Sequence, residues 1–520
     1  MHTAATRPIV WAIGGNDSGG GAGIAADLRA LAAFGVHGCA AVAALIAQNS
    51  VAVTQIDPVA AEILAAQLAA LAADLLPAAV KTGMLGSAQN LDVVGQTVVR
   101  LRAEQKTLPW VVDPVLRAST GAAFADPPLL AAYRRWLPQI TLLTPNRAEA
   151  AALLGRPSLD RAADVEAAAA ELVALGCGAV LITGGDAGSG FADDYLHSPQ
   201  ASGWLRLPRL DTTATHGTGC TCASGAAAAL ALGYTVADAA VLAKMATTQA
   251  LRAGYAAGSG AGPVGVPTGF VVYDNLPQMT LAGQSLAALD AVAARPAFAP
   301  LTGADRDLGL YAVLDSAVSL VRALDAGVRC VQLRVKDRGC PTLATQVADC
   351  VAAARHAGAQ LYINDHWQAA LAAGAPGVHL GQEDLPDADL AALAAAGVRL
   401  GISTHSVWEV CRAATQKPSY IACGPLYPTT SKDMPWLAQG NDNLAFWSAL
   451  LPQPVVGIGG IDVDRARSAA AAGASGIAVI RALTEADDWR VAAQQLQQAI
   501  QAGRDGAPWP VPALPRPTLD

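Results

Sequence analysis

The second half of the chain repeats a short apolar pattern eight times. Each run is rich in Val, Ile, Leu or Tyr, and most runs end in polar or glycine residues, as strands buried on both faces of a parallel sheet do. Alanine-rich helical stretches separate most of them. The runs cover residues 309–315, 330–337, 360–365, 377–384, 399–404, 420–428, 454–461 and 476–483. These β/α units predict a (β/α)₈ barrel over residues 307–500, with its chemistry at the carboxyl ends of the strands.

The first half has fewer apolar runs, and their spacing is less even. Its strand-like runs cover residues 9–15, 109–114, 140–146 and 179–185. Leucines at helical spacing predict an amphipathic helix over residues 62–76, namely Leu64, Leu68, Leu71 and Leu75. We therefore expect an open, doubly wound α/β/α sandwich over residues 1–275, with ligands at the carboxyl ends of its strands.

Two further segments are set apart by composition. Residues 276–306 are rich in Gly, Pro and Ala, which predicts a linker between the two domains. Residues 501–520 are rich in proline, which predicts a disordered or loosely docked tail.

Charge and cysteine usage narrow the class of protein. Only 15% of the residues are charged, the net charge is −8, and the sequence has no stripe of Lys and Arg, so we expect no nucleic-acid partner. Nine scattered cysteines without a C-x-x-C pair indicate free thiols in a reducing cytoplasm. The sequence has no signal peptide and no apolar run long enough for a membrane span, so we predict a cytoplasmic protein with small-molecule substrates.

The stretch "ATHGTGCTCASG" places a glycine loop and a thiol directly before an alanine-rich helical run. One interpretation is an anion site, in which backbone N–H groups of Gly217, Thr218 and Gly219 meet a phosphate at the helix N-terminus. The other is an ordinary tight turn into a buried helix, with Cys220 as a small packing residue. Asp27, after the glycine-rich turn at 14–23, leaves a similar choice: it accepts hydrogen bonds from an amino group of a flat substrate, or it only favours a helix start.

An ordered set of motifs favours the functional interpretations: "GGNDSGGGAGIAAD", "ALIAQNS", "VKTGMLGS", "VVDPV", "TPNRAEA" and "THGTGC". In this order they resemble the hydroxymethylpyrimidine and phosphomethylpyrimidine kinases of thiamine synthesis, which are ribokinase-like, over about residues 9–270. The resemblance implies a ribokinase-like sandwich with ATP as co-substrate. It also implies a pyrimidine pocket made by Gly15, Asp27, Gln48, Met84 and Val115.

The same resemblance implies the phosphate side of the site. Asn146 and Glu149 would organise Mg²⁺ and the ATP phosphates, and Thr183, Gly217 and Thr218 would contact nucleotide or phosphate. Gly219 would complete the anion hole. Cys220 would deprotonate or orient the substrate hydroxymethyl group, with its thiol pKa lowered by the helix N-terminus. Thr183 and the stretch 117–121 lack lysines that many family members carry, which puts the rate and the nucleotide affinity in question.

In the predicted barrel, polar residues follow several strands. Gln332, Arg334 and Lys336 alternate along one run and share one face of it, where they suit a diphosphate or form a charged surface strand. Asp365 and Asp384 each end a strand and could share one Mg²⁺, or they could be separate capping residues.

These motifs, with "GISTH", "GPLYPTTSK" and "VVGIGG", resemble thiamine phosphate synthase, a TIM barrel, over about residues 307–495. The resemblance implies that Asn364 joins Gln332, Arg334 and Lys336 in holding a pyrimidine diphosphate. Ser403 would orient or protonate the leaving diphosphate. The remaining substrate contacts would come from Thr429, Ser431, Lys432 and Gly459. Arg481 stands where the family has a small residue and could strengthen phosphate binding.

Together the two resemblances imply a bifunctional transferase, in which the product of the first domain is the substrate of the second. It would phosphorylate hydroxymethylpyrimidine twice and join the diphosphate to thiazole phosphate, releasing pyrophosphate. The alternative is a pyridoxal-type vitamin kinase fused to a regulatory or tautomerase barrel. Met84 and Gln48 favour the pyrimidine, and the complete Gln-x-Arg-x-Lys set favours the synthase. The oligomeric state stays open, a homodimer included.

Overall fold

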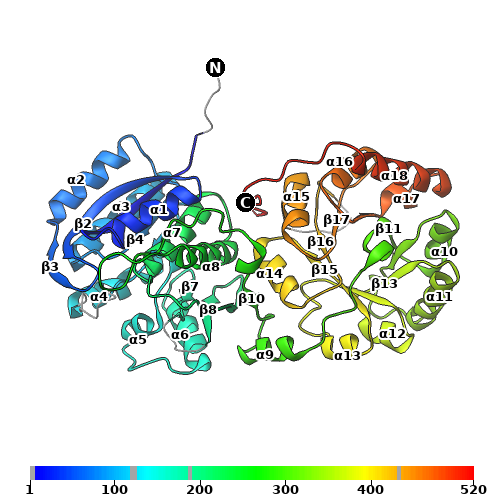
Figure 1. The fold of residues 1–520 in the computed structure, drawn as a ribbon, viewed down its shortest axis with the longest axis horizontal. Helices are drawn as coiled ribbons and strands as arrows, with labels where there is room; N and C mark the ends of the chain where they lie inside the picture. Colours follow the sequence, from blue (N-terminus) through cyan, green and yellow to red (C-terminus); the bar gives the residue numbers. More distant parts are fainter. Residues whose placement is uncertain (1–5, 117–125, 186–189, 430–434, 520) are drawn as a thin grey trace, which may run out of the picture. The chain divides into compact units, whose positions relative to one another are not determined.

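The protein is described by a computed structural model, which covers residues 6–116, 126–185, 190–429 and 435–519. The chain divides into two compact units, Met1–Leu286 and Ala287–Asp520 (Figure 1). Each unit is described separately below.

The first unit is built on one ten-stranded sheet, in the order β10-β9-β8-β7-β6-β5-β4-β1-β2-β3. The strands from β7 through β4 and β1 to β2 run parallel, while β3 and the series β8, β9 and β10 pair antiparallel at the two sides. The strands are β1 Ile9–Asp17, β2 His37–Gln48, β3 Val53–Pro58, β4 Ala79–Thr82, β5 Trp110–Val112, β6 Leu142–Leu143, β7 Val180–Ile182, β8 Phe191–His197, β9 Ser202–Pro208 and β10 Gln278–Met279.

Helices cover this sheet in two packed groups. Helix α7 packs against both α1 and α8, and α2, α3 and α4 form a second series. The helical elements are α1 Gly23–Ala33, α2 Ala61–Ala72, α3 Ala88–Glu104, α4 Pro127–Trp136, η1 Leu137–Gln139, α5 Arg147–Leu154, α6 Ala162–Ala174, α7 Thr218–Ala231, α8 Val236–Arg252 and η2 Tyr273–Asn275.

Alternation along the strands explains why helices are needed on both faces. Trp11 and Ile13 of β1 belong to the large apolar cluster that includes Leu64 and Leu68 of α2. Val10, between residues of that face, is equally buried but lies outside this cluster, because successive strand residues point to opposite faces. The predicted α/β/α sandwich and the helix over 62–76 are confirmed, although α2 ends four residues earlier.

The second unit is a closed barrel of eight parallel strands, in which β11 pairs with both β12 and β18. Each predicted run contains one strand, so the (β/α)₈ prediction is confirmed. The strands are β11 Gly309–Leu314, β12 Cys330–Leu333, β13 Gln360–Asn364, β14 Gly377–Leu380, β15 Arg399–Thr404, β16 Tyr420–Cys423, β17 Val455–Ile458 and β18 Gly476–Val479.

Two helical elements precede the first barrel strand, and the others follow the barrel strands in turn (Figure 1). They are α9 Ala287–Ala294, η3 Gly303–Arg306, α10 Ala317–Asp325, α11 Leu343–His356, α12 Trp367–Ala372, α13 Leu390–Ala395, α14 Val407–Thr415, α15 Gly440–Leu450, α16 Val463–Ala471, α17 Arg481–Thr484 and α18 Trp489–Arg504. Several begin at Ser or Asp side chains that accept a hydrogen bond from the first turn, as Ser406 does for α14 and Asp462 for α16.

The segment expected as a linker, 276–306, instead carries defined structure. Its first part forms β10, which extends the sheet of the first unit, and its later part forms α9 and η3. Leu289, Phe298 and Leu301 are each at most 3% exposed. Burial of these apolar side chains holds the segment in place. The Gly, Pro and Ala content of the sequence did not predict this packing.

The proline-rich tail is docked on the barrel. The Trp509 indole donates to Asp442 at 2.8 Å, Leu437 N–H donates to the carbonyl of Thr518 at 2.8 Å, and Arg516 N–H donates to Asn443. A tail without regular secondary structure is thus tied down by hydrogen bonds to α15 and the loop before it.

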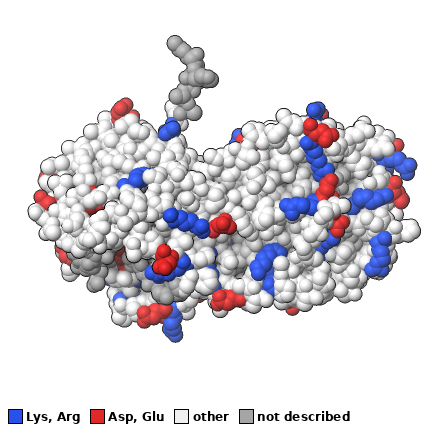
Figure 2. All heavy atoms as spheres, in the orientation of Figure 1, with Lys and Arg blue, Asp and Glu red and all other residues white. Residues whose placement is uncertain are grey.

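Charged groups on the surface are sparse and mixed. On the face shown in Figure 2, Lys and Arg are interspersed with Asp and Glu among many uncharged residues. Across the described part of the chain, no helix is both long enough and apolar enough to cross a bilayer.

Candidate active sites

The glycine-rich turn after β1 is organised by Asp17. Its carboxylate accepts hydrogen bonds from the N–H groups of Gly19, Gly21 and Ala22 at 2.8–2.9 Å, and His216 Nε2 lies 3.0 Å away. Burial alone would raise the pKa of Asp17, but the hydrogen bonds from His216 and the backbone outweigh it and hold the pKa below its usual value. Asp17 thereby ties the first glycine loop to the second one, which carries His216.

Asp27 lies at the base of this site with no exposed surface. One oxygen accepts from Lys81 Nζ at 2.7 Å and from Ser224 Oγ at 2.8 Å. The other oxygen, Oδ2, is buried without a hydrogen-bond partner among the described residues. A buried unpaired carboxylate oxygen is costly, so Asp27 is well suited to accept from a donor group on a ligand.

Lys81 is a buried cation between two carboxylates and the thiol. Burial would lower its pKa, but Asp27, Cys220 and Asp113 raise it above the usual value. Burial raises the pKa of Asp113 to about 6, with Lys81 opposing and Asp27 adding to the rise. Lys81 and Asp113 were not singled out from the sequence. The available signal was an ionisable residue inside or directly after a buried strand, as in "AVKT" and "WVVD".

The expected lowering of the Cys220 pKa is wrong. Burial raises the pKa of this thiol to about 12; the Lys81 ammonium opposes the rise, and the carboxylates of Asp27 and Asp113 add to it. The Cys220 side chain is half-buried at the first turn of α7. Two carboxylates and burial therefore outweigh the favourable helix N-terminus.

The loop before Cys220 has the geometry of a tight entry into α7. Gly217 has φ 90°, and a Cβ atom there would lie 2.3 Å from the carbonyl oxygen of Gly21, so only glycine fits. The Thr218 hydroxyl donates to the carbonyl of Thr215 at 2.6 Å. Gly219 is exposed at the first turn of the helix, where N–H groups lack intrahelical acceptors.

Apolar residues gather beside Gly15. A Cβ at Gly15 would lie 2.6 Å from Ile46 and 3.3 Å from the Met84 sulfur. Ala44, Ile46 and Met84 form a small buried cluster, and Val115 packs against it. Gln48, at the end of β2, has its amide nitrogen 3.1 Å from His216 Nε2. Four of the predicted pocket residues thus lie beside this cluster or at its strand end. Asp27 is paired with Lys81, whose charge also acts on the Cys220 thiol.

Asn146 and Glu149 form a capping box at the start of α5. Each side chain accepts from the backbone N–H of the other at 2.9 Å, and Glu149 also accepts from Leu116 N–H at 3.3 Å. Thr183 forms a parallel bridge with Asn146. Asn146, Glu149 and Thr183 are adjacent. The side chains of Asn146 and Glu149 already have structural hydrogen-bond partners. The stretch 117–121 lies outside the described residues.

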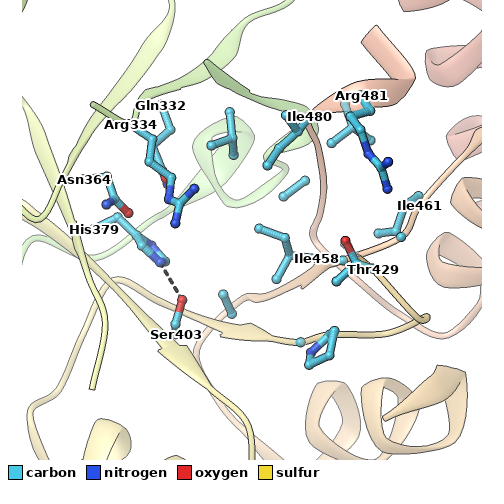
Figure 3. A pocket seen from close by; sticks show the side chains of 18 of the residues that line it. Gln332, Arg334, Asn364, His379, Ser403, Thr429, Ile458, Ile461, Ile480 and Arg481 are labelled. Atoms are coloured by element: carbon cyan, nitrogen blue, oxygen red, sulfur yellow. Dashed lines mark hydrogen bonds between the residues drawn. The ribbon is translucent and has the colours of Figure 1, made fainter. Parts of the chain in front are cut away.

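A cavity of about 390 Å³ opens at the carboxyl ends of the barrel strands (Figure 3). Arg334 and Arg481 lie on opposite sides of it, and His379 points at Ser403 on the side of Arg334. The predicted residues that line it are Gln332, Arg334, Asn364, Asp365, Asp384, Ser403, Thr429 and Gly459.

One predicted barrel residue of the described part of the chain is not brought to this cavity, and two others are not described. Lys336 is exposed and is not part of its lining. Strand β12 ends at Leu333, so the alternation expected to carry through to Lys336 stops before it. Ser431 and Lys432 lie outside the described residues.

Asp365 and Asp384 make a carboxylate pair at the cavity rim. Burial and the Asp384 charge raise the pKa of Asp365 to about 6, with Arg334 and Arg338 opposing. Asp365 has φ 61°, a strained backbone for a residue with a side chain. Across the described residues no three His, Cys, Asp or Glu side chains form a metal cluster. Two adjacent carboxylates fit Mg²⁺ only if a ligand supplies further oxygens.

The loop after β17 approaches the same cavity through two glycines. Gly459 has φ 101°, and a Cβ there would lie 2.8 Å from the Cα of Pro425. Gly460 follows with φ 67°, and Arg465 donates to its carbonyl at 2.7 Å. Successive left-handed glycines expose backbone N–H groups that can bind an anion.

Comparisons with known proteins assign a family to each unit. The family profile of phosphomethylpyrimidine kinase matches residues 17–265, and that of thiamine monophosphate synthase matches residues 310–483. A probable thiamine biosynthetic bifunctional enzyme from Oryza sativa subsp. japonica, designated chloroplastic, is 34% identical over 92% of this chain and 86% of its own length. A thiamine-phosphate synthase of Serratia proteamaculans is 47% identical over 39% of this chain and 96% of its own length.

Among solved structures, a pyridoxal kinase from Staphylococcus aureus in complex with AMP-PCP and pyridoxal matches with 28% identity and a TM-score of 0.46, covering 51% of this chain and 95% of that protein. The full-length relative and the two family profiles cover both units in the same order. The chain therefore belongs to the family of bifunctional thiamine biosynthetic enzymes, with a hydroxymethylpyrimidine and phosphomethylpyrimidine kinase domain followed by a thiamine-phosphate synthase domain.

Proposed function

We propose that the first unit uses ATP to phosphorylate 4-amino-5-hydroxymethyl-2-methylpyrimidine to its mono- and diphosphate. The second unit then condenses the diphosphate with 4-methyl-5-(2-phosphoethyl)thiazole and releases pyrophosphate. The observation that carries the proposal is the barrel cavity, where Arg334 and a carboxylate pair face one space with Ser403.

In the kinase domain, the pyrimidine binds beside Gly15, Met84 and Val115. The buried, unpaired oxygen of Asp27 accepts from the pyrimidine amino group, which relieves an unsatisfied buried acceptor. Gln48, at the strand end next to His216, closes the polar side of the pocket.

The substrate hydroxymethyl group lies at Cys220. A thiol whose pKa is about 12 stays protonated at neutral pH, so Cys220 orients the hydroxyl as a neutral group and is not a thiolate base. Phosphoryl transfer depends mainly on positioning and charge stabilisation, which Gly219 and the α7 N-terminus supply.

The ATP phosphates approach from Asn146, Glu149 and Thr183, with Gly217 and Thr218 at the glycine loop. Magnesium ions, when bound, would neutralise charge on the phosphate oxygens. Because Glu149 is held by two backbone N–H groups, its carboxylate is fixed in place.

In the synthase domain, Gln332 and Asn364 hold the pyrimidine and Arg334 holds its diphosphate, with Lys336 reaching in from outside the cavity. Asp365 and Asp384 would hold Mg²⁺, which offsets the charge of the diphosphate. The carbon–oxygen bond to the diphosphate breaks, its electron pair leaves with pyrophosphate, and the thiazole nitrogen attacks the pyrimidine methylene. Ser403 assists departure, and Thr429, Ser431, Lys432 and Gly459 hold the thiazole phosphate.

The wider setting is proposed on sequence grounds. We propose a cytoplasmic location, because the cysteines are scattered and unpaired, and small molecules as the main partners, with neither nucleic acid nor membrane among them. A homodimer is compatible with this function.

Separated half-reactions test the proposal with the full chain. With hydroxymethylpyrimidine, ATP and Mg²⁺ but no thiazole phosphate, mass detection should show the mono- and then the diphosphate. With supplied diphosphate and thiazole phosphate but no ATP, thiamine phosphate should form. Phosphorylation of pyridoxal but not of the pyrimidine would contradict the first assignment, and an inert barrel would contradict the second.

A further inference from the structure

Five side chains cross the barrel interior in one hydrogen-bonded chain from Gln332 to Ser403. Gln332 Nε2 lies 2.8 Å from the Tyr311 hydroxyl, which lies 2.8 Å from the Tyr420 hydroxyl. The Tyr420 hydroxyl lies 2.7 Å from His379 Nδ1, and His379 Nε2 lies 2.8 Å from Ser403 Oγ. The two ends of the chain line the cavity, and Figure 3 shows the link between His379 and Ser403.

The direction of each hydrogen bond in this chain follows from its Gln332 end. The amide nitrogen of Gln332 can only donate, so the Tyr311 oxygen accepts and its one proton goes to Tyr420. The Tyr420 proton then goes to His379 Nδ1, which leaves the imidazole proton on Nε2, where it is donated to Ser403. The Ser403 oxygen is thus an acceptor, and its own hydroxyl proton is free for a group in the cavity.

The reverse direction is disfavoured by burial. If Tyr420 donated to Tyr311, the Tyr311 proton would have no acceptor among the described residues, and Tyr311 is 1% exposed. An unsatisfied buried donor raises the free energy of the fold. A charged imidazole would also donate from Nδ1 to Tyr420 and leave the buried Tyr420 hydroxyl proton without an acceptor, so the ring carries one proton.

Packing holds the members of the chain in place. The rings of Tyr420 and His379 are stacked with centroids 5.6 Å apart, and Tyr311 meets Tyr420 edge to face at 6.1 Å. A Cβ at Gly401 would lie 2.1 Å from Tyr420 Cζ, so the neighbouring strand leaves room for this ring only because it carries glycine there. Side chains held this tightly keep one set of hydrogen bonds.

We propose that Tyr311, Tyr420 and His379 are positioning residues that fix the direction of the Ser403 hydroxyl, so that it donates a hydrogen bond to the departing diphosphate. The proposal rests on the proposed function of the barrel and of Ser403 in it. The proton stays on Ser403. It also follows that Gln332, with its nitrogen engaged by Tyr311, presents its oxygen to the pyrimidine amino group, so recognition of that group and the orientation of Ser403 are coupled.

The test uses full-length protein with supplied pyrimidine diphosphate and thiazole phosphate. Tyr420→Phe keeps the ring and breaks the chain. We expect kcat to fall about tenfold, as for loss of one positioning hydrogen bond, with little change in KM for thiazole phosphate. Tyr362→Phe is the matched control. Tyr362 belongs to the same ring cluster, 5.0 Å from Tyr420, but its hydroxyl bonds to Gln360, outside the chain, so its kcat should equal that of wild type.

A double variant separates positioning from packing. In a Ser403→Ala background, Tyr420→Phe should have no further effect on kcat, because no hydroxyl remains to be oriented. If Tyr420→Phe folds poorly, Tyr311→Phe breaks the chain one link earlier and should give the same pattern. Equal kcat for wild type and Tyr420→Phe, or a full tenfold loss in the Ser403→Ala background, would overturn the proposal. Wild-type protein that makes no thiamine phosphate would instead overturn the proposed function.

Discussion

Removing the charge of Lys81 should destabilise the kinase domain more than any surface ion pair could. The Lys81 ammonium lies 2.7 Å from Asp27, and the two side chains are 1% and 0% exposed. In Lys81→Met, the buried carboxylates of Asp27 and Asp113 lose the cation that acts on both of them. Breaking a buried pair in this way typically costs about 3–5 kcal/mol.

The free energy of unfolding lost in Lys81→Met has an upper limit that depends on pH. One of the two carboxyls can take up a proton instead of staying charged. Protonating an ordinary carboxyl of pKa about 3.9 requires about 5 kcal/mol at pH 7.5 and about 2 kcal/mol at pH 5.5. The folded variant binds this proton and the unfolded chain does not, so stability falls as pH rises between these values. We expect a loss of about 4–5 kcal/mol at pH 7.5 and about 2 kcal/mol at pH 5.5.

This loss of stability is measured by urea unfolding of the full chain, in which hydrogen exchange of peptides from β4 and α1 reports the unfolding of the kinase domain. Asp27→Asn combined with Lys81→Met should recover part of it. Arg135→Met is the control: Arg135 pairs with Asp92 at the surface, where its side chain is 57% exposed, and its loss should cost less than about 1 kcal/mol. A Lys81→Met loss below about 1 kcal/mol, or one independent of pH, would refute the reasoning.

Three further predictions concern single residues. Gly401→Ala, whose Cβ would lie 2.1 Å from Tyr420, should destabilise the barrel by about 1–3 kcal/mol, measured by hydrogen exchange of β15; unchanged exchange would contradict the packing. Cys220, with its pKa raised to about 12, should be alkylated slowly by iodoacetamide at pH 7.5 and faster as pH rises, as followed by mass spectrometry; rapid labelling at pH 7.5 would show a thiolate. Arg481→Ala should raise the KM for thiazole phosphate about tenfold, as for loss of a charged hydrogen bond; an unchanged KM would remove Arg481 from phosphate binding.

The eight barrel strands could be predicted because each is a short apolar run that a buried parallel strand requires. The predicted residues on β13, β15 and the β17 loop reach the cavity for the same reason: they directly follow or end these strands. Lys336 does not, because β12 ends at Leu333 and the period of two has no meaning beyond a strand end. Where a strand stops depends on its neighbours, which the run itself does not encode.

The missed parts of the fold depend on contacts between distant residues. Strand β8 reads "FADDYLH", which looks too polar for a strand. Its Asp193 is paired with Arg206 of β9 at 2.7 Å, and its Asp194 with Lys244 of α8 at 2.7 Å. Neither pair could be recognised without the fold. Likewise, Asp27 was expected to bind the pyrimidine, but its ion pair with Lys81 could not be predicted. The two residues come together only when the fold brings α1 and β4 close to each other.

The central claim is that the two domains act in series on one pyrimidine. The most direct measurement is one incubation of the full chain with hydroxymethylpyrimidine, thiazole phosphate, ATP and Mg²⁺, with mass detection of products over time. We predict that pyrimidine monophosphate and diphosphate appear transiently and that thiamine phosphate and pyrophosphate accumulate. Diphosphate that accumulates without thiamine phosphate, or a pyrimidine that is never phosphorylated, would contradict the account.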